Sequence, residues 1–267
     1  MYRLNIYSYY KLYHKENLCY NLTMEKRDLK ISIGHLYPKH LNLYGDMGNI
    51  ITLKKRCEWR GIEVEYLEVN PEDSIPECDL YFIGGGQDRE QIAISSCLYK
   101  HKTFLSDQRD DGSVFLGICG GYQLLGHYYQ PFEGDRLLGV SLLDAFTVAG
   151  NKRFIGNVTA KSDFLMPETL VGFENHAGLT YLQGETKALA TVEIGNGNNG
   201  EDRTEGARYK NGFGTYLHGS LLPKNPHFAD YLISLALQKR YADKIELIKL
   251  DDKIEIDAHN SVVGKAY

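Results

Sequence analysis

The sequence predicts an α/β fold in which a mostly parallel sheet carries helices on both faces, followed by a more β-rich second half. Between residues 30 and 130, strand-like apolar or alternating runs alternate with helix-like segments, the pattern of a parallel sheet with covering helices. From about residue 136 the strand-like runs become shorter and turn-rich segments separate them. With 267 residues and 43% apolar content, the chain is long enough to bury a large core.

The first half contains four expected strands and three expected helices. Each apolar run ends at a turn signal, such as Gly61 after the first helix or the three glycines at 84–86 after a strand. We expect strands at 30–36, 62–69, 79–83 and 114–118, and helices at 49–60, 89–110 and 122–128.

The second half is predicted to add five short strands and a closing helix. The strands are expected at 154–160, 170–174, 188–194, 206–209 and 214–217, and the helix at 226–241. The segment 195–204, G-N-G-N-N-G-E-D-R-T, has the composition of a surface loop.

One domain over residues 30–242 is the simplest organisation, because no repeat and no Pro/Ser-rich linker interrupts it. Residues 1–29 are interpreted as an N-terminal extension. We expect residues 1–23 either to be mobile or to be absent from the native protein because the start codon was assigned too far upstream. Residues 243–267 form a charged, partly apolar C-terminal tail of unassigned structure.

Composition excludes several classes of protein. The net charge of −5 gives no basic footprint for a nucleic acid, and no apolar run reaches the roughly 18–20 residues of a membrane span. The N-terminus lacks a signal-peptide pattern, and the five cysteines are odd in number without a C-x-x-C pair, which indicates free thiols in a reducing cytoplasm. The sequence shows neither a metal-binding motif nor a G-x-x-x-x-G-K-[ST] phosphate loop, so we expect no metal and no ATP site on this chain.

The stretch F-L-G-I-C-G-G-Y-Q-L-L-G, residues 115–126, places Cys119 between an expected strand and an expected helix. Such a turn presents its side chain at the carboxyl edge of a parallel sheet, where ligands bind, and Gly117 and Gly121 allow close approach of the backbone. The N–H groups of the following helix favour a thiolate, and the N–H of Gly120 can donate to an oxyanion. A buried structural cysteine is the alternative, but G-x-C-G-G after a strand favours a nucleophile.

A nucleophilic cysteine needs a base. The best candidate among the nine histidines is His218 in G-T-Y-L-H-G-S, because it follows an expected strand and can face the same sheet edge. His176 in G-F-E-N-H-A-G is the second candidate. On spacing alone, a structural role for either histidine remains the commoner outcome.

With these residues in view, the chain resembles the class I glutamine amidotransferases, and within them the cobyric-acid-synthase-like branch. Within that branch it is similar to the glutaminase subunits of lipid II isoglutaminyl synthases, over residues 30 to about 240. The elbow specifies only the class, whereas the first and last matching motifs are specific to these subunits. The matching motifs are L-N-L-Y-G-D-M-G-N-I (41–50), F-I-G-G-G-Q-D-R-E-Q (82–91), G-I-C-G-G-Y-Q-L-L-G (117–126), V-G-F-E-N-H-A-G-L-T-Y (171–181), G-N-G-N-N (195–199) and K-N-G-F-G-T-Y-L-H-G-S-L-L-P-K-N (210–225).

The resemblance implies a flavodoxin-like amidotransferase sheet and assigns roles by position. Cys119 matches the nucleophile and His218 the base and acid. Arg153 stands where the family has an arginine that contacts glutamine, and a guanidinium can hold an α-carboxylate through two parallel hydrogen bonds. The glycine loop, with Gly85 and Gly86, matches the second oxyanion-hole element beside Gly120.

The resemblance also implies a substrate and a partner. L-glutamine would be hydrolysed, and the ammonia would pass to a Mur-ligase-like subunit in a heterodimer. That partner, with its own ATP and Mg²⁺, would amidate the α-carboxylate of D-glutamate in the lipid II stem peptide during peptidoglycan biosynthesis.

One feature departs from the wider class, which carries His-x-Glu with a carboxylate that orients the imidazole. Here the sequence is His218-Gly219-Ser220, a gap that the cobyric-acid branch shares. We expect the orienting acid to come from elsewhere in this chain, with Glu174 and Asp46 as candidates, or from the partner subunit.

Three other functions compete with this interpretation. A cobyric-acid-type amidotransferase normally carries an ATP-binding domain in the same chain, which this sequence lacks. An intracellular cysteine peptidase is disfavoured by the matches at Arg153 and 195–199. A catalytically silent scaffold for the ligase is disfavoured by the presence of Cys119 and His218.

Overall fold

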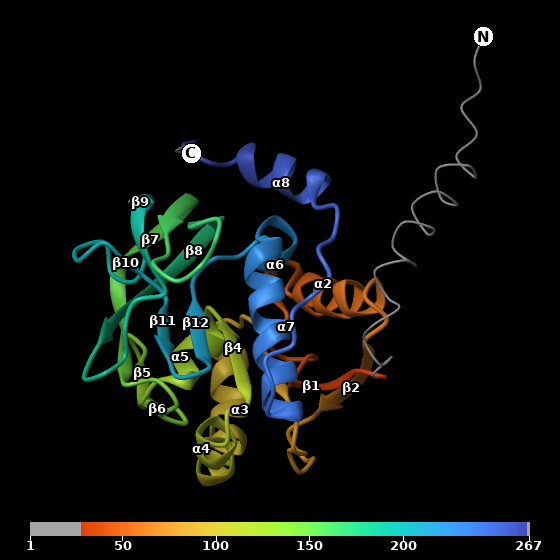
Figure 1. The fold of residues 1–267 in the computed structure, drawn as a ribbon. Coiled ribbons are helices and arrows are strands. Elements are labelled where there is room, and N and C mark those ends of the chain that lie inside the picture. Colours follow the sequence, from red (N-terminus) through yellow and green to blue (C-terminus); the bar gives the residue numbers. More distant parts are fainter. Residues whose placement is uncertain (1–27, 266–267) are drawn as a thin grey trace.

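The structure is a computed structural model that describes residues 28–265. Two six-stranded sheets lie side by side, and helices cover both faces of the first (Figure 1). Residues 1–27 and 266–267 lie outside the described residues, so nearly all of the expected N-terminal extension 1–29 does too.

The first sheet contains all four strands expected in the first half of the chain. Its order is β11-β12-β4-β3-β1-β2; neighbours pair in parallel except for the antiparallel edge pair β11–β12. Strand β4 is buried throughout, as its continuous apolar sequence requires for a central parallel strand. The strands are β1 (Lys30–Leu36), β2 (Glu63–Val69), β3 (Leu80–Ile83), β4 (Val114–Ile118), β11 (Ala207–Tyr209) and β12 (Gly212–Thr215).

The helices sort onto the two faces of this sheet. On one face α2 and α7 pack together, α7 against β1 and β4; on the other, α5 lies against β4 and β12 with α3 beside it (Figure 1). The helices are α2 (Met47–Glu58), α3 (Asp88–Lys100), α4 (Lys102–Asp110), α5 (Gly120–Leu125), α6 (Leu221–Lys224), α7 (Pro226–Tyr241) and α8 (Lys253–Asn260), and a short 3₁₀ turn, η1, spans Leu43–Gly45. The predicted α/β fold is confirmed.

Two of the expected helices are wrong in extent. The single helix expected over 89–110 is divided into α3 and α4, because His101 leaves helical geometry (φ −94°, ψ 9°) and its N–H bonds only three residues back, to Leu98 O. The helix expected over 122–128 begins at Gly120 and ends at Leu125, since Gly126 is extended and Tyr128 already belongs to the next strand.

The second sheet is built around a long antiparallel pair, β7 and β8. Strand β7 also pairs with β9 and, in parallel, with β5. The strands expected at 154–160 and 170–174 are only parts of these two, which run for 17 and 14 residues. The members are β5 (Tyr128–Gln130), β6 (Leu137–Leu138), β7 (Ala145–Lys161), β8 (Thr169–Leu182), β9 (Ala190–Ile194) and β10 (Thr204–Glu205).

The segment 195–204 is not the plain surface loop expected from its composition. Asn198 is fully buried, and its amide donates to Gly206 O at 2.8 Å while its Oδ1 accepts from the Tyr122 hydroxyl at 3.2 Å. Its polar side chains satisfy internal backbone groups that a turn leaves unpaired, which composition alone cannot distinguish from solvation.

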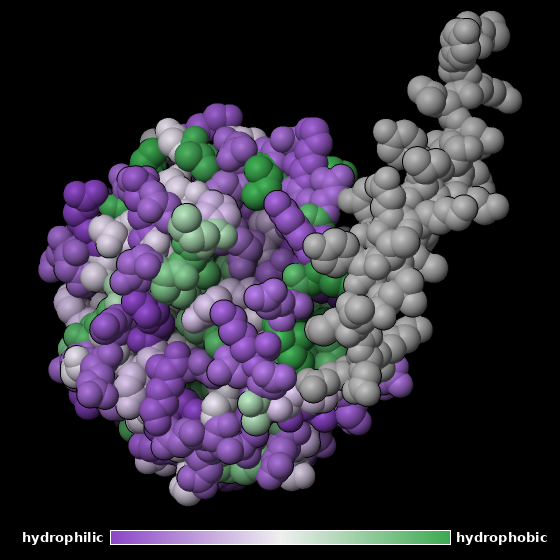
Figure 2. Space-filling model, viewed as in Figure 1, coloured by the Kyte–Doolittle hydropathy of each residue, from purple (hydrophilic) through white to green (hydrophobic). Residues whose placement is uncertain are grey.

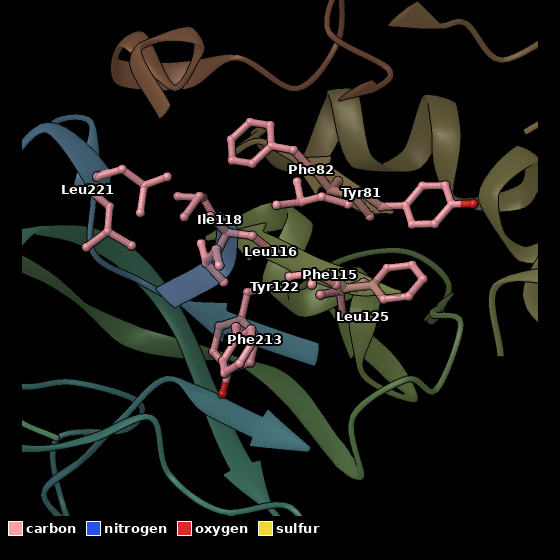
Figure 3. Packing of buried hydrophobic residues seen from close by; sticks show 14 of the residues in the cluster. Tyr81, Phe82, Phe115, Leu116, Ile118, Tyr122, Leu125, Phe213 and Leu221 are labelled. Atoms are coloured by element: carbon pink, nitrogen blue, oxygen red, sulfur yellow. The ribbon is translucent and has the colours of Figure 1, made fainter. Parts of the chain in front are cut away.

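The core fills the space where β3, β4, β12 and α5 meet. On this face Phe115 stacks on Tyr81 with ring centroids 4.8 Å apart, and on the opposite face Phe213 packs against Phe228 and Tyr231 of α7; Figure 3 shows part of this core. On the face seen in Figure 2, hydrophilic side chains predominate and apolar ones are scattered between them. Among residues 28–265, no helix is long and apolar enough to cross a membrane.

The C-terminal tail runs back along the molecule after α7 and ends with α8 near α6 (Figure 1). Arg56 of α2 fastens it: the guanidinium, 1% exposed, donates to Asp230 of α7 at 2.6 Å and to Asp252 of the tail at 2.6 Å. His259 of α8 bonds to Lys224 O at 2.8 Å. Through Arg56, α7 and the C-terminal tail are thereby bound to α2.

Arg56→Ala should lower the free energy of unfolding by about 2 kcal/mol, because Asp252 loses its buried cation and Asp230 keeps only its bond to Arg60. Chemical denaturation measures the change. Lys55→Ala is the matched control on the same helix, since its ion pair with Glu58 is exposed and its loss should cost under about 0.5 kcal/mol. Equal effects of the two substitutions would contradict this role of Arg56.

Candidate active site

Cys119 occupies the turn between β4 and α5 in a strained backbone conformation, with φ 49° and ψ −107°. Residues other than glycine adopt such values only where the surroundings enforce them. Here the Cys119 N–H donates to Thr215 O at 2.8 Å, and its carbonyl accepts from Gln123 N at 2.9 Å. The turn therefore has the form of the expected nucleophile elbow.

Glycines beside Cys119 allow the 84–86 loop to lie against the elbow. A Cβ atom at Gly120 would come within 2.8 Å of Gly86 O, and one at Gly121 would overlap Ile83 O. The Gly121 N–H donates to Gly84 O at 3.1 Å. Any side chain here would force the loop away from the cysteine.

His218 follows β12 and reaches the same place. Its backbone pairs with Phe173 of β8 through two hydrogen bonds, 2.9 Å and 3.2 Å long, and its side chain is buried. A Cβ atom at Gly85 would lie 2.9 Å from His218 Cε1 and 3.5 Å from Cys119 Cβ. The side chains of Cys119 and His218 thus meet beside Gly85, at the same edge of the sheet.

Asp46 stands behind the imidazole. Its Oδ1 lies 3.8 Å from His218 Nδ1, with both side chains fully buried, and its Oδ2 accepts the Gly85 N–H at 2.6 Å. A buried carboxylate beside an imidazole stabilises the imidazolium. Of the two acids considered from the sequence, Asp46 has the position of an orienting acid.

Glu174 serves a different segment. Its carboxylate accepts the backbone N–H groups of Asn196 and Gly197 at 2.9 Å and the Asn196 side chain at 2.6 Å. Its hydrogen bonds therefore fix the 195–199 loop and none goes to His218.

His176, the second histidine candidate, is also in a structural position. Its ring stacks on Tyr216 at 3.6 Å, and its Nδ1 contacts Gly178 O at 2.8 Å. Burial lowers the pKa of His176 to about 3, so the ring is neutral at physiological pH.

The pKa of His218 is shifted in the opposite direction to that of His176. Burial alone lowers the pKa of His218, but the charges of Cys119 and Asp46 outweigh it, and the pKa is raised well above its usual value of 6.5. The site therefore favours the protonated, imidazolium form of His218.

The expected oxyanion-hole glycines differ in availability. The N–H of Gly85 is bound to Asp46, so it is not free to receive an oxyanion. For the N–H groups of Gly86 and Gly120, no acceptor is found within the described part of the chain. These two, brought together by the close approach of the loop to the elbow, remain as donors.

Arg153 lies on β7 and reaches the site through other side chains. Its Nε donates to Asn175 Oδ1 at 2.6 Å, and the Asn175 amide donates to the Tyr44 hydroxyl at 2.7 Å. The Tyr44 ring meets the His218 ring edge-to-face at 5.0 Å.

No group of three or more His, Cys, Asp or Glu residues that could hold a metal ion occurs within residues 28–265.

Comparison with known proteins identifies the family to which the chain belongs. Residues 32–226 match the CobB/CobQ-like glutamine amidotransferase domain. The chain belongs to this family. The resemblance inferred from the motifs is thereby confirmed.

Individual relatives agree with the assignment to this amidotransferase family. The lipid II isoglutaminyl synthase (glutamine-hydrolyzing) subunit GatD of Staphylococcus aureus is 43% identical over 239 residues, 89% of this chain and 96% of that protein. The same subunit of Streptococcus pneumoniae is 41% identical over 226 residues, 84% of this chain and 86% of that one. A crystal structure of a glutamine amidotransferase shares the fold, with a TM-score of 0.53 and 17% identity over 76% of this chain and 98% of that chain.

Three residues of this amidotransferase site were not singled out from the sequence. Tyr44 and Asn175 lie inside matching motifs, which was the available signal. Glu205 carried none: it is fully buried, accepts from Thr215 Oγ1 at 2.6 Å and from Tyr216 N at 3.0 Å, and burial raises its pKa to about 7. It holds the segment that leads to His218.

Because Cys119 contributes to the raised pKa of His218, Cys119→Ala should lower that pKa. NMR titration of the imidazoles measures it: His218 should stay protonated through neutral pH in the wild type and lose its proton at lower pH in the variant. His176 is the internal control and should stay neutral in both. A wild-type His218 that titrates near 6.5 would contradict this shift.

Proposed function

We propose that residues 30–242 form a glutamine amidotransferase domain that hydrolyses L-glutamine to glutamate and ammonia. The observation that carries the proposal is the strained, glycine-flanked Cys119 facing His218, with the buried Asp46 behind the imidazole. Membership of the family and 43% identity to a glutamine-hydrolysing subunit support the same reaction.

The chemistry follows from the positions of these groups. The Cys119 thiolate attacks the side-chain amide carbon of glutamine, and the negative charge moves to the amide oxygen. As the C–N bond breaks, the His218 imidazolium donates its proton and ammonia leaves. The now neutral His218 accepts a proton from water, whose oxygen attacks the thioester, and glutamate and the thiolate are released.

Backbone donors would stabilise the charge on the oxygen in both steps. The N–H groups of Gly120 and Gly86 are available and lie on the two segments that meet at the elbow. Gly85 contributes differently: its N–H holds Asp46, and Asp46 stabilises the imidazolium. Arg153 would bind the α-carboxylate of glutamine.

The relatives are named as subunits of an enzyme that uses lipid II, and on that similarity we extend the proposal to a partner. Ammonia would pass to a Mur-ligase-like subunit in a heterodimer before bulk water protonates it. That partner, holding ATP and Mg²⁺ in the cytoplasm, would amidate the D-glutamate α-carboxylate of the lipid II stem peptide.

Ammonia release from L-glutamine, with and without the ligase partner, tests the proposal. Cys119→Ala should reduce turnover at least about a thousandfold, because the nucleophile is lost. Cys97→Ala, which removes a half-buried thiol on α3, is the control and should leave turnover unchanged.

Comparing ammonia release with and without the ligase partner tests two further points. No turnover by the wild type with its partner would contradict the proposed function and favour a scaffold. Turnover that is equal with and without the partner would show that the ligase supplies no catalytic group.

Asp46→Asn tests the orienting acid. The amide oxygen can still accept the Gly85 N–H, but the charge beside His218 is lost, so kcat should fall about a hundredfold or more. Glu174→Gln removes the charge of the other candidate acid and should change kcat little. A larger fall in Glu174→Gln, at an unchanged melting temperature, would contradict the role of Asp46.

A further inference from the structure

Tyr44 is held in an unusual position over the active site. It lies in η1 with φ 53° and ψ 29°, in the left-handed region that a tyrosine rarely adopts. Neighbouring bonds fix the segment: Leu43 N donates to Gly85 O at 3.1 Å, and Ser220 Oγ donates to Gly45 O at 2.6 Å. Strain of this kind persists only where the surrounding structure determines it.

The ring and the hydroxyl of Tyr44 make separate contacts. The ring meets His218 edge-to-face at 5.0 Å, and the hydroxyl accepts a hydrogen bond from Asn175 Nδ2 at 2.7 Å. The side chain is nevertheless 48% exposed, so burial of its surface does not account for the position. The Tyr44 side chain therefore links the His218 imidazole to Asn175 of β8 in the second sheet.

The orientation of the Asn175 amide is fixed by its neighbours. Arg153 Nε can only donate, so the oxygen of Asn175 must face it, at 2.6 Å, and the nitrogen must face Tyr44. A second bond runs from Arg153 Nη2 to the Asn175 backbone oxygen at 3.3 Å. Both bonds use the same side of the guanidinium, so Nη1 and the outer N–H of Nη2 stay available for a bidentate bond to a carboxylate.

We propose that Asn175 and Tyr44 are positioning residues of the glutamine subsite, which hold Arg153 in the orientation that receives the substrate α-carboxylate. The inference rests on the proposed function and deepens it. An exposed arginine samples many rotamers, and ordering it on binding weakens affinity. The Tyr44–Asn175 pair orders Arg153 before glutamine arrives, and it ties that order to the position of His218.

The consequence is a specific kinetic signature. Pre-ordering Arg153 strengthens the binding of substrate and transition state equally, so its loss raises KM and leaves kcat nearly unchanged. We expect Asn175→Ala to raise the KM for L-glutamine about tenfold, and Tyr44→Phe, which keeps the ring over His218, about threefold. Tyr99→Phe, at another partly exposed tyrosine on α3, is the matched control and should change neither constant.

The experiment is steady-state kinetics of the full chain in complex with its ligase partner, with Asn175→Ala, Tyr44→Phe and Arg153→Ala alone and combined. Because Asn175 acts through Arg153, Asn175→Ala should add nothing to the KM of the Arg153→Ala variant. The α-amide of glutamine, which lacks the carboxylate, should be used equally by wild type and Asn175→Ala.

Several results would overturn the inference. These are an unchanged KM in both single variants, a fall in kcat at constant KM, or additive effects in the Arg153→Ala background. If Asn175→Ala does not fold, Tyr44→Phe decides alone. Glutamine binding to the Cys119→Ala complex, measured by calorimetry, tests the same prediction without turnover, so an inactive wild type would reject the proposed function and leave this test valid.

Discussion

The site depends on one buried carboxylate. Asp46, at the start of α2, contacts His218 with one oxygen and the Gly85 N–H with the other. A buried carboxylate costs little free energy only when it is paired or hydrogen-bonded, and Asp46 has one contact of each kind. The imidazole and the glycine loop, which come from distant parts of the sequence, are thereby placed relative to each other and to Cys119.

The rest of α2 is fastened so that Asp46 cannot shift freely. Asn49 Oδ1 accepts Leu222 N at 2.9 Å, which links α2 to the segment just after His218. At the other end, Arg56 binds α7 and the C-terminal tail. The tail thus contributes to the site from a distance, because it stabilises the helix whose first turn carries the acid.

The two sheets contribute different residues to the site. The first supplies the elbow, the glycine loop and the strand that leads to His218, at the carboxyl ends of parallel strands where such sheets bind ligands. The second supplies Arg153 and Asn175, and its backbone at Phe173 pairs with that of His218. In the proposed function, chemistry on one sheet and glutamine recognition on the other require a stable junction, which the Phe173–His218 bonds and the Tyr44 contact provide.

The order of strands and helices in the first half and the strand-to-helix turn at Cys119 could be predicted from the amino-acid sequence, because hydrophobic periodicity, glycine positions and short motifs are local properties. The sequence left Asp46 and Glu174 undecided, missed the break at His101, and described the buried turn at Asn198 as surface. The three-dimensional fold shows which of the two acids lies beside the imidazole, where the helix breaks and which polar side chains are buried, because each of these depends on residues that are distant in the sequence.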